Sequence, residues 1–518
     1  MSETAEITEN IAKTAAQYDQ MPYESKPFPQ SQPSRLGAIA KLFGLSAPPL
    51  KNCRVLELGC ASGGNLVPLA LLHPEAEFVG VDVSQRQVDT GRARIEKLGI
   101  KNFRLLCKSF TELAEDAGKF DYIICHGVYS WIPRALQDAI MSVIKARLSP
   151  EGVAFVSYNV LPGWRMLQPI RDAFLSVLPP GLEGTEKVKA AIELAQFVSE
   201  ASEGSGAYGE AFDWWLERFK TVRLDYIAHE YLEDTNDPIM FKDFAGRAAA
   251  HGLAYLGESD FQTMVAEHYP PHVAEEIHRR AGGDMIAAEQ LMDVVSGRKF
   301  RQTLLVHHSR APLINRQLTP DALNGLHLVG SMGMELKEEA EQTIIRIGGQ
   351  DAYTVKNNAM RKALAKFFDR FPAGSQVSDL AVGDEALSDV KKGFYSLVIA
   401  GLVVPFSEPV QAAATPANYP RASSLVLREA RMSLPFTTNL RHELVGLEPA
   451  TIFLLSKMDG SKNQEELIQL LAEEGRSGRI IFFKDEKKAD TLEEAADFAR
   501  YHAPMLIANL AKAALLVN

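Results

Sequence analysis

The feature that most constrains the fold is an alternation, from about Lys51 to Tyr158, of short β-branched apolar runs with segments of helical periodicity. Strands that are apolar along their length, with amphipathic helices between them, predict a parallel sheet covered on both faces. We therefore expect a doubly wound α/β fold whose ligands bind at the carboxyl ends of the strands. The five expected strands are Arg54–Leu58, Glu77–Val81, Phe103–Cys107, Phe120–Cys125 and Gly152–Tyr158.

After the fifth strand the pattern changes to long helical segments, such as Thr185–Ser202 and Gly209–His229. Short apolar runs then return at Gly252–Leu256 and Phe300–His307, and we expect both to be late strands of the same sheet. One domain with two helical insertions follows from this pattern. Its expected bounds are residues 35–310, with insertions at about 165–240 and 262–298.

The last two hundred or so residues contain two stretches in which a helix, a short helix and a longer helix with a β-prone tail follow one another. This order is typical of a winged helix, and it predicts winged-helix-like modules at 311–407 and 421–518. The Pro/Ala-rich segment Glu408–Pro420 between them has the composition of a linker. Because Asn463–Glu474 is acidic where a DNA reader would carry a basic helix, we expect a packing or partner-recognition role.

Charge and composition exclude several classes of function. The 518 residues carry 55 Lys and Arg against 66 Asp and Glu, a net charge of −11, which disfavours nucleic-acid binding and favours cationic ligands. No apolar run approaches the roughly 18 residues needed to span a bilayer, and the N-terminus has no signal-peptide pattern. The four cysteines lack metal or redox spacing, so we expect reduced thiols in a cytoplasmic protein.

The strongest functional motif is Val55–Asn65, in which a strand enters a turn of small residues that opens a helix. Gly59, Ala61 and Gly63 leave room for a ligand to approach the backbone at a helix N-terminus. A degenerate dinucleotide site, with Gly59, Ala61 and Gly64 at the glycine positions, also fits this spacing. Glu57 separates the two interpretations, because its carboxylate would repel a pyrophosphate and would attract the ammonium and sulfonium of S-adenosylmethionine.

An acidic residue ends the second strand at the offset used for ribose binding. Asp82 lies 23 positions after Gly59, close to the roughly 20 residues typical of nucleotide-binding α/β folds. Its carboxylate can accept both ribose hydroxyls. The alternative, that Asp82 only caps the next helix, is less favoured because Ser84 is better placed for capping.

At these residues the chain resembles the class I S-adenosylmethionine-dependent methyltransferases, over about Lys51 to Tyr158. The resemblance implies a Rossmann-like methyltransferase sheet. It also implies that Ser109 and Phe110, after the third strand, flank the adenine, although Ser109 stands where the superfamily often has an acid. His126, after the fourth strand, would lie beside the methionine part of the cofactor.

A more specific resemblance lies outside the sheet. The segments Tyr18–Tyr23, Lys26–Pro33, Tyr158–Trp164 and His229–Leu232 look like those of bacterial methyltransferases that carry a methyltransferase regulatory domain. That group includes rickettsial protein-lysine methyltransferases that modify outer-membrane proteins, and the likeness extends over most of the chain. It implies N-methylation of protein lysine.

Aromatic side chains at two strand ends fit an amine acceptor, because π-faces attract a cation. The expected substrate residues follow the fourth strand, follow the fifth, or lie in the helical insertion: Tyr129, Trp131, Tyr158, Asn159, Trp164, His229 and Glu230. Each aromatic taken alone is more often part of a packed core. His229 and Glu230 fit equally well a structural role at a helix end, and the absent second histidine of H-E-x-x-H excludes that zinc motif.

The N-terminal segment, residues 1–34, is expected to pack as a strap, because its proline-rich part, Tyr18–Pro33, cannot form a stable helix. Near the strand ends it would act as a lid, with Tyr18 and Tyr23 contacting the cofactor. The alternative is an ordered arm that only stabilises the core.

The residues predict an S-adenosylmethionine-dependent methyltransferase, the resemblance implies that its acceptor is a protein lysine, and no metal is assigned. A small-molecule or natural-product methyltransferase is the alternative within enzymes, and a non-catalytic cofactor-binding scaffold is the alternative outside them. Neither nucleic acid nor membrane insertion is expected. The sequence leaves a homodimer open.

Overall fold

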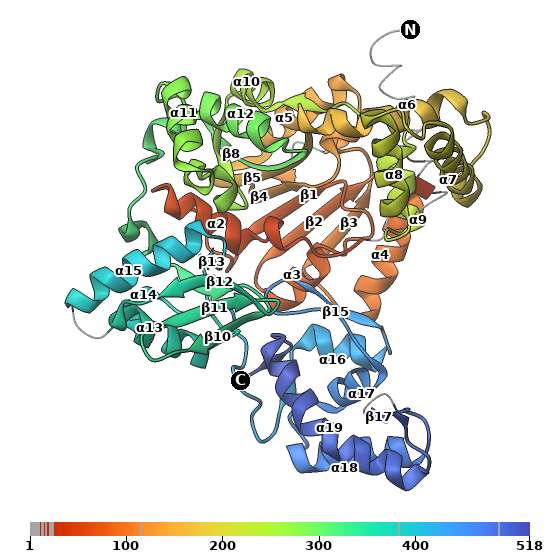
Figure 1. Cartoon of the computed structure of the whole chain (residues 1–518), viewed down its shortest axis with the longest axis vertical. Coiled ribbons are helices and arrows are strands. Elements are labelled where there is room, and N and C mark those ends of the chain that lie inside the picture. Colours follow the sequence, from red (N-terminus) through yellow and green to blue (C-terminus); the bar gives the residue numbers. More distant parts are fainter. Residues whose placement is uncertain are drawn as a thin grey trace.

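The computed structural model describes residues 11, 15, 18–19, 25–113, 117–381, 384–484 and 487–518. Its largest sheet has the strand order β3-β2-β1-β4-β5-β8-β7, with β6 paired to β5 (Figure 1). The strands are β1 (Arg54–Leu58), β2 (Glu77–Asp82), β3 (Phe103–Cys107), β4 (Phe120–Cys125), β5 (Leu148–Leu161), β6 (Ile239–Met240), β7 (Leu253–Glu258) and β8 (Phe300–His307).

The first five strands are parallel, and β8 runs antiparallel to both β5 and β7. The predicted α/β fold class and the two late strands are therefore confirmed. Because β8 is antiparallel, its first residue lies at the same edge of the sheet as the ends of the parallel strands, and Phe300 pairs with Asn159.

Helices cover both faces of this sheet. Alternate residues of β1 belong to different apolar clusters: Val55 packs with helices α2, α3 and α4, and Leu56 packs with α5 and α10. Burial on both sides explains why the strands are apolar along their length. These helices are α2 (Pro33–Leu42), α3 (Leu66–Leu72), α4 (Gln85–Lys97), α5 (Arg134–Arg147) and α10 (Phe241–Ala250).

The first helical insertion has a core of its own, which includes Trp164, Phe174 and Trp215. The helix predicted at Gly209–His229 is broken into α8 and α9, where Thr221 donates its hydroxyl to the carbonyl of Arg218. The insertions contain α6 (Gln168–Val177), α7 (Gly184–Ala201), α8 (Ala207–Phe219), α9 (Leu224–Tyr231), α11 (Pro271–Ala281) and α12 (Met285–Ser296).

The region after β8 packs directly on the large sheet, since Leu328, Phe367 and Phe394 belong to the same apolar cluster as Val55. Its helices follow in the predicted order of a helix, a short helix and a longer helix, but a three-stranded antiparallel sheet, β10-β11-β12, was not predicted. The elements are β9 (His327–Gly330), β10 (Met334–Glu338), β11 (Thr343–Ile347), β12 (Gln350–Val355), α13 (Asn358–Asp369), α14 (Val377–Leu380), α15 (Asp384–Ile399) and β13 (Val403–Phe406).

The last part of the chain forms a separate lobe beneath the sheet (Figure 1). The Pro/Ala segment before it is more than a loose linker, because Ala412 and Ala413 are buried. The lobe contains β14 (Arg421–Ala422), α16 (Ser424–Arg431), β15 (Phe436–Thr438), β16 (Leu444–Gly446), α17 (Pro449–Lys457), α18 (Gln464–Arg476), β17 (Phe483–Lys484), β18 (Lys487–Lys488), α19 (Leu492–Lys512) and β19 (Leu516–Val517).

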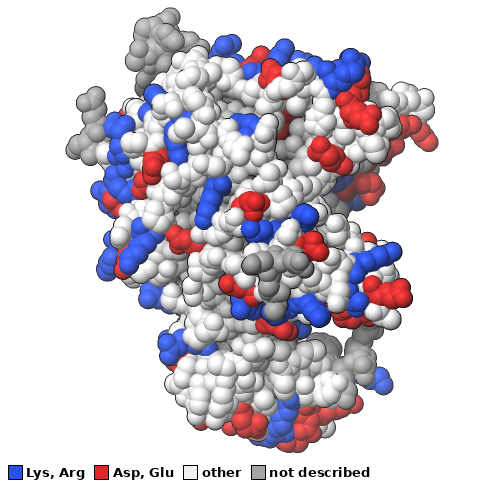
Figure 2. Space-filling model, turned by 90° about the vertical axis from the view of Figure 1, so that its left-hand side faces the viewer, with Lys and Arg blue, Asp and Glu red and all other residues white. Residues whose placement is uncertain are grey.

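The excess of acidic residues does not form one acidic field on the face drawn in Figure 2, where blue and red side chains are interspersed among white ones. Among the described residues, no helix is both long enough and apolar enough to cross a bilayer.

Candidate active site

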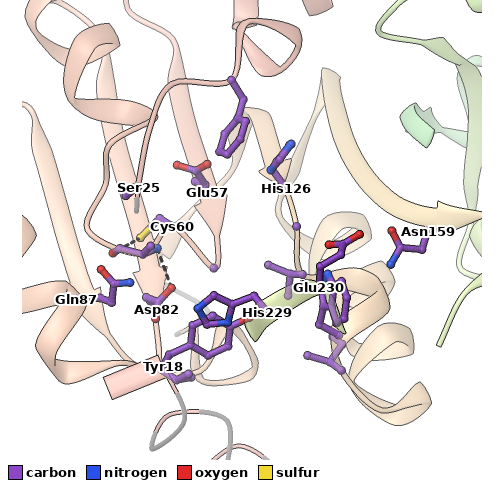
Figure 3. A pocket seen from close by; sticks show the side chains of 18 of the residues that line it. Tyr18, Ser25, Glu57, Cys60, Asp82, Gln87, His126, Asn159, His229 and Glu230 are labelled. Atoms are coloured by element: carbon purple, nitrogen blue, oxygen red, sulfur yellow. Dashed lines mark hydrogen bonds between the residues drawn. The ribbon is translucent and has the colours of Figure 1, made fainter. Parts of the chain in front are cut away.

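A cavity of about 530 Å³ lies at the carboxyl ends of β1, β2, β4 and β5 (Figure 3). Glu57 and Asp82 line one side of it, and Asn159 and Glu230 line the other, with His126 between them. Most of the residues predicted from the sequence therefore meet in one place. The predicted residues that line it are Tyr18, Glu57, Gly59, Ala61, Asp82, Ser109, Phe110, His126, Trp131, Asn159, Trp164, His229 and Glu230.

The small-residue turn after β1 brings the backbone to the cavity. Gly59 has a φ of 70°, and a Cβ there would lie 2.4 Å from Val128, so only glycine fits. Ala61 also has a positive φ, 49°. Gly63 does not line the cavity, because it packs against the ring of Phe103, which a Cβ would approach to 2.8 Å. Its contribution is close packing of the turn.

Glu57 is a buried carboxyl group at the end of β1. Its Oε1 accepts a hydrogen bond of 2.9 Å from Asn65, while Oε2 is buried without a hydrogen-bond partner. Burial raises the pKa of Glu57 to about 8, against the lowering effect of the Asn65 bond. An unpartnered buried carboxyl oxygen beside a cavity calls for a donor or a cation.

Asp82 ends β2 and is already held in place by the backbone. Its two carboxylate oxygens accept hydrogen bonds from the amides of Ala61 (2.8 Å) and Ser84 (2.9 Å). Burial raises its pKa, although these backbone donors oppose the shift. The helix cap belongs to Ser84, which accepts from the amide of Gln87, so Asp82 keeps lone pairs for a ligand.

The residue after β4 contacts the strap, and the residues after β3 form a short turn. His126 stacks on Phe28 with ring centroids 3.6 Å apart, and burial together with the Lys26 cation lowers its pKa to about 3. Ser109 accepts a hydrogen bond from the amide of Thr111, so it caps a short 3₁₀ turn that begins at Phe110. Its hydroxyl therefore has a structural partner already.

Two tryptophans form part of the cavity wall. Trp131, after β4, and Trp164, after β5, meet edge to face with centroids 6.2 Å apart. Asn159 lies beside them with its Nδ2 buried and unpartnered. Trp164 is held by a hydrogen bond of 2.7 Å from its Nε1 to Asn236.

Two predicted substrate residues, Tyr129 and Tyr158, do not line the cavity. Both are fully buried behind its wall, where Tyr158 stacks on Phe244 at 3.9 Å and hydrogen-bonds Thr303. Strand alternation explains the position of Tyr158: Tyr158 and Asn159 point to opposite sides of β5, and only Asn159 lines the cavity. Their contribution is to the core behind the wall.

Helix α9 closes the cavity opposite the sheet. The Nδ1 of His229 donates a 2.9 Å hydrogen bond to Oε1 of Glu233, and its ring stacks on Tyr18 of the strap with the centroids 5.1 Å apart. Burial raises the pKa of Glu230 to about 7, although the cations of Arg171 and Arg218 oppose the shift. The second predicted strap residue, Tyr23, lies outside the described residues.

Family models match three parts of the chain. A model described as "Methyltransferase domain" matches residues 49–213, "Predicted methyltransferase regulatory domain" matches 223–307, and "PKMT, C-terminal winged helix domain" matches 418–515. The uncharacterized protein RP028 of Rickettsia prowazekii is 38% identical over 45% of this chain and 93% of its own length.

Whole-length matches decide the family. The uncharacterized protein RP789 of Rickettsia prowazekii is 30% identical over 92% of this chain and 89% of its own length. The structure of PKMT2 from Rickettsia typhi in complex with AdoHcy superposes with a TM-score of 0.85 and 27% identity, covering 96% of this chain and 100% of that one. The chain belongs to this family of S-adenosylmethionine-dependent methyltransferases.

The cavity of the methyltransferase fits its cofactor. The orphaned Oε2 of Glu57 suits a cationic group, Asp82 keeps lone pairs for ribose hydroxyls, and a Cβ at Gly59 has no room. The residues on this side of the cavity therefore fit the chemistry of the cofactor. In the described part of the methyltransferase, no cluster of three or more His, Cys, Asp or Glu side chains is arranged to hold a metal.

Sequence reasoning missed several residues that line the cavity. Trp214 and Arg218 are one helical turn apart in α8, with the guanidinium 5.8 Å from the indole centroid. Lys299 and Phe300 line it too, because antiparallel β8 begins at this edge. The predicted late strand at Phe300–His307 could have indicated Lys299 and Phe300, because an antiparallel strand places its first residues beside the carboxyl ends of the parallel strands.

Proposed function

We propose that this methyltransferase transfers a methyl group to the side-chain amine of a protein lysine. The likeness to PKMT2 over nearly the whole chain supports this proposal most directly. The cavity gives independent support, because its lining includes tryptophan rings and the carboxyl group of Glu230. These are the groups that attract an ammonium ion and then release its proton.

The acceptor half of the cavity is lined by Trp131, Trp164 and Trp214 and by the polar side chains of Asn159 and Glu230. The cations of Arg218 and Lys299 lie at the ring of Trp214. Tryptophan has the most attractive π-face for a cation, and burial strengthens that attraction. Glu230 adds a carboxyl group whose pKa of about 7 is suited to exchange a proton near neutral pH.

The amine must lose a proton before it can attack, since an unperturbed lysine has a pKa of about 10.4. We propose that ionised Glu230 takes this proton while the aromatic wall holds the nitrogen in place. S-adenosylmethionine supplies the methyl group on its sulfonium, so that a C–N bond forms, the C–S bond breaks, and S-adenosylhomocysteine is released. Glu230 then returns the proton to solvent.

Incubation with tritiated S-adenosylmethionine and a fractionated cell extract tests the class of acceptor. The proposal predicts label in protein, stable to acid and recovered as methyl-lysine after hydrolysis. Label confined to small molecules would replace the proposal with the natural-product alternative. Cofactor binding without transfer to any fraction would favour the scaffold. An Asp82→Asn variant serves as the control that lacks full cofactor affinity.

We also propose the division into strap, sheet domain and two C-terminal modules at the bounds predicted above. The cytoplasm is the proposed compartment, which four free cysteines support. A homodimer stays a prediction that light scattering on the purified protein decides.

A further inference from the structure

One side chain connects the C-terminal lobe with the cofactor half of the cavity. His442 lies in the turn between β15 and β16, is fully buried, and places its Nε2 2.8 Å from Oδ1 of Asn65. The two residues are 377 positions apart in the chain. Asn65 ends the small-residue turn after β1, so the lobe contacts the turn that carries Gly59 and Ala61.

Asn65 uses both ends of its side-chain amide. Its Nδ2 donates to Oε1 of Glu57 (2.9 Å) and to Oγ of Ser31 (3.0 Å), and its Oδ1 accepts from the amide of Phe28 (2.9 Å). Rotating the amide by half a turn would place its oxygen against the Glu57 carboxyl group and its NH₂ against the Phe28 N–H. The bonding pattern therefore fixes its orientation.

The second acceptor site on Oδ1 belongs to His442. Since Asn65 offers only an oxygen there, the imidazole must donate from Nε2, and its Nδ1 is buried without a partner. Burial and the nearby His73 and Arg35 lower the pKa of His442 to about 3, so the ring is neutral. A neutral ring adds no positive charge beside a cation-binding carboxyl group.

The turn that carries His442 has an unusual backbone conformation, which side-chain hydrogen bonds stabilise. His442 has a φ of 66°, a left-handed conformation that glycine or asparagine adopts more readily. Asn439 holds the turn by accepting hydrogen bonds of 2.9 Å from the amides of Arg441 and Glu443. An unfavourable backbone conformation at a buried histidine with a cross-domain partner indicates that its side chain is used.

We propose that His442 is a positioning residue of the cofactor site: through Asn65 it orients Glu57 and fixes the strap at Phe28. Asn65 then contacts three separate parts of the chain at once, namely the end of β1, the strap and the C-terminal lobe. The lobe is thus part of the cofactor-binding machinery in addition to any role toward the acceptor. This inference rests on the cofactor site and is independent of which acceptor is methylated.

The lobe also docks elsewhere, which provides a matched control. Glu429 of α16 is buried and pairs with Arg94 of α4 at 2.5 Å, far along α4 from the cavity. Arg94→Met weakens the docking of the lobe without changing any partner of Asn65. His442→Leu removes the donor to Asn65, and His442→Gln keeps an N–H at a similar reach from the backbone.

Calorimetry with S-adenosylhomocysteine on the three full-length variants separates the roles. We expect His442→Leu to weaken binding about tenfold, the loss typical of one buried hydrogen bond, and His442→Gln to stay within about threefold of wild type. Arg94→Met should leave affinity within about twofold. Unchanged affinity in His442→Leu would overturn the proposal, as would an equal loss in Arg94→Met.

Hydrogen exchange on the wild-type chain tests the same coupling without any substitution. Because coupling between two sites is reciprocal, bound S-adenosylhomocysteine should slow exchange in residues 436–446 as well as around the cavity. Slower exchange around the cavity alone, with 436–446 unchanged, would contradict it. A failure to methylate lysine would leave both measurements intact, so the two proposals fail separately.

Discussion

Trp131 and Trp164 meet edge to face across the ends of neighbouring strands, with ring centroids 6.2 Å apart and ring planes inclined by 83°. Arg171 lies on Trp131, its guanidinium carbon 5.8 Å from the ring centroid, so the indole is fixed from behind. This pair gives the acceptor half of the cavity a rigid aromatic wall.

The first prediction concerns that wall. We expect Trp131→Ala to raise KM for the acceptor about tenfold through loss of a partly desolvated cation–π contact. Affinity for S-adenosylhomocysteine should change by less than about twofold. Steady-state kinetics with the labelled acceptor measures both. Tyr208→Ala is the control, because Tyr208 is an exposed aromatic of α8 that lies outside the cavity lining.

The second prediction concerns the ribose carboxylate. Asp82→Asn keeps the side-chain shape but replaces one acceptor oxygen with a donor. We expect cofactor affinity to fall by about 1–3 kcal/mol, the range for a buried charge-assisted hydrogen bond. Calorimetry measures the loss. Asp89→Asn removes a charge from the exposed face of α4, the helix that follows Asp82, and should bind normally. Equal affinity in the two variants would refute the assignment.

The third prediction concerns the pH dependence of cofactor binding. Glu57 has a pKa of about 8 in the cofactor-free protein, so it is protonated at pH 6.5 and must ionise to pair with a cation. The amino group of S-adenosylhomocysteine is cationic between pH 6.5 and 8. Its affinity for the protein should therefore strengthen as pH rises through this range. Glu57→Gln should remove this dependence.

The same raised pKa has a consequence for folding. A carboxyl group whose pKa is raised on folding stabilises the protein below its unfolded value of about 4.5, and that contribution is lost as pH rises toward 8. The melting temperature of the cofactor-free wild type should fall relative to Glu57→Gln across this window. A constant difference between the two proteins would show that Glu57 is not buried as described.

The fourth prediction concerns Glu230 as the base. With a pKa of about 7, it is ionised above neutral pH while lysine is still an ammonium ion, so kcat/KM should rise through pH 7 and then level off. The Glu230→Gln variant lacks the base, so it can use only the small fraction of lysine that is already deprotonated in solution. Its kcat/KM should therefore keep rising to about pH 10. We expect it to be about a hundredfold slower at pH 7.5. Glu217→Gln, which changes an exposed glutamate of α8 outside the cavity lining, should retain the wild-type profile.

Local patterns in the sequence predicted the sheet and the meeting of Glu57, Gly59 and Asp82 at one cavity. Continuous apolar strands and the offset between Gly59 and Asp82 are short-range signals that survive in the fold. A turn signal was overlooked: Gly348-Gly349 between two alternating runs is typical of a hairpin, and it joins β11 and β12.

Contacts between segments far apart in the chain could not be predicted from local sequence patterns. Nothing near Asn65 in the sequence indicates that His442 will reach it, because that contact depends on how the C-terminal lobe docks on α3 and α4. The inward or outward direction of Tyr158 and Asn159 depends in the same way on the register of β5 with β8. Aromatic composition at strand ends indicated a cavity wall but not which rings form it.

Mass spectrometry of the labelled acceptor protein tests the central claim most directly. The account predicts a methyl group on the side-chain nitrogen of lysine in peptides from wild-type reactions, with the signal greatly reduced for Glu230→Gln at neutral pH. Methylation found only on another residue type, or only on a small molecule, would contradict it.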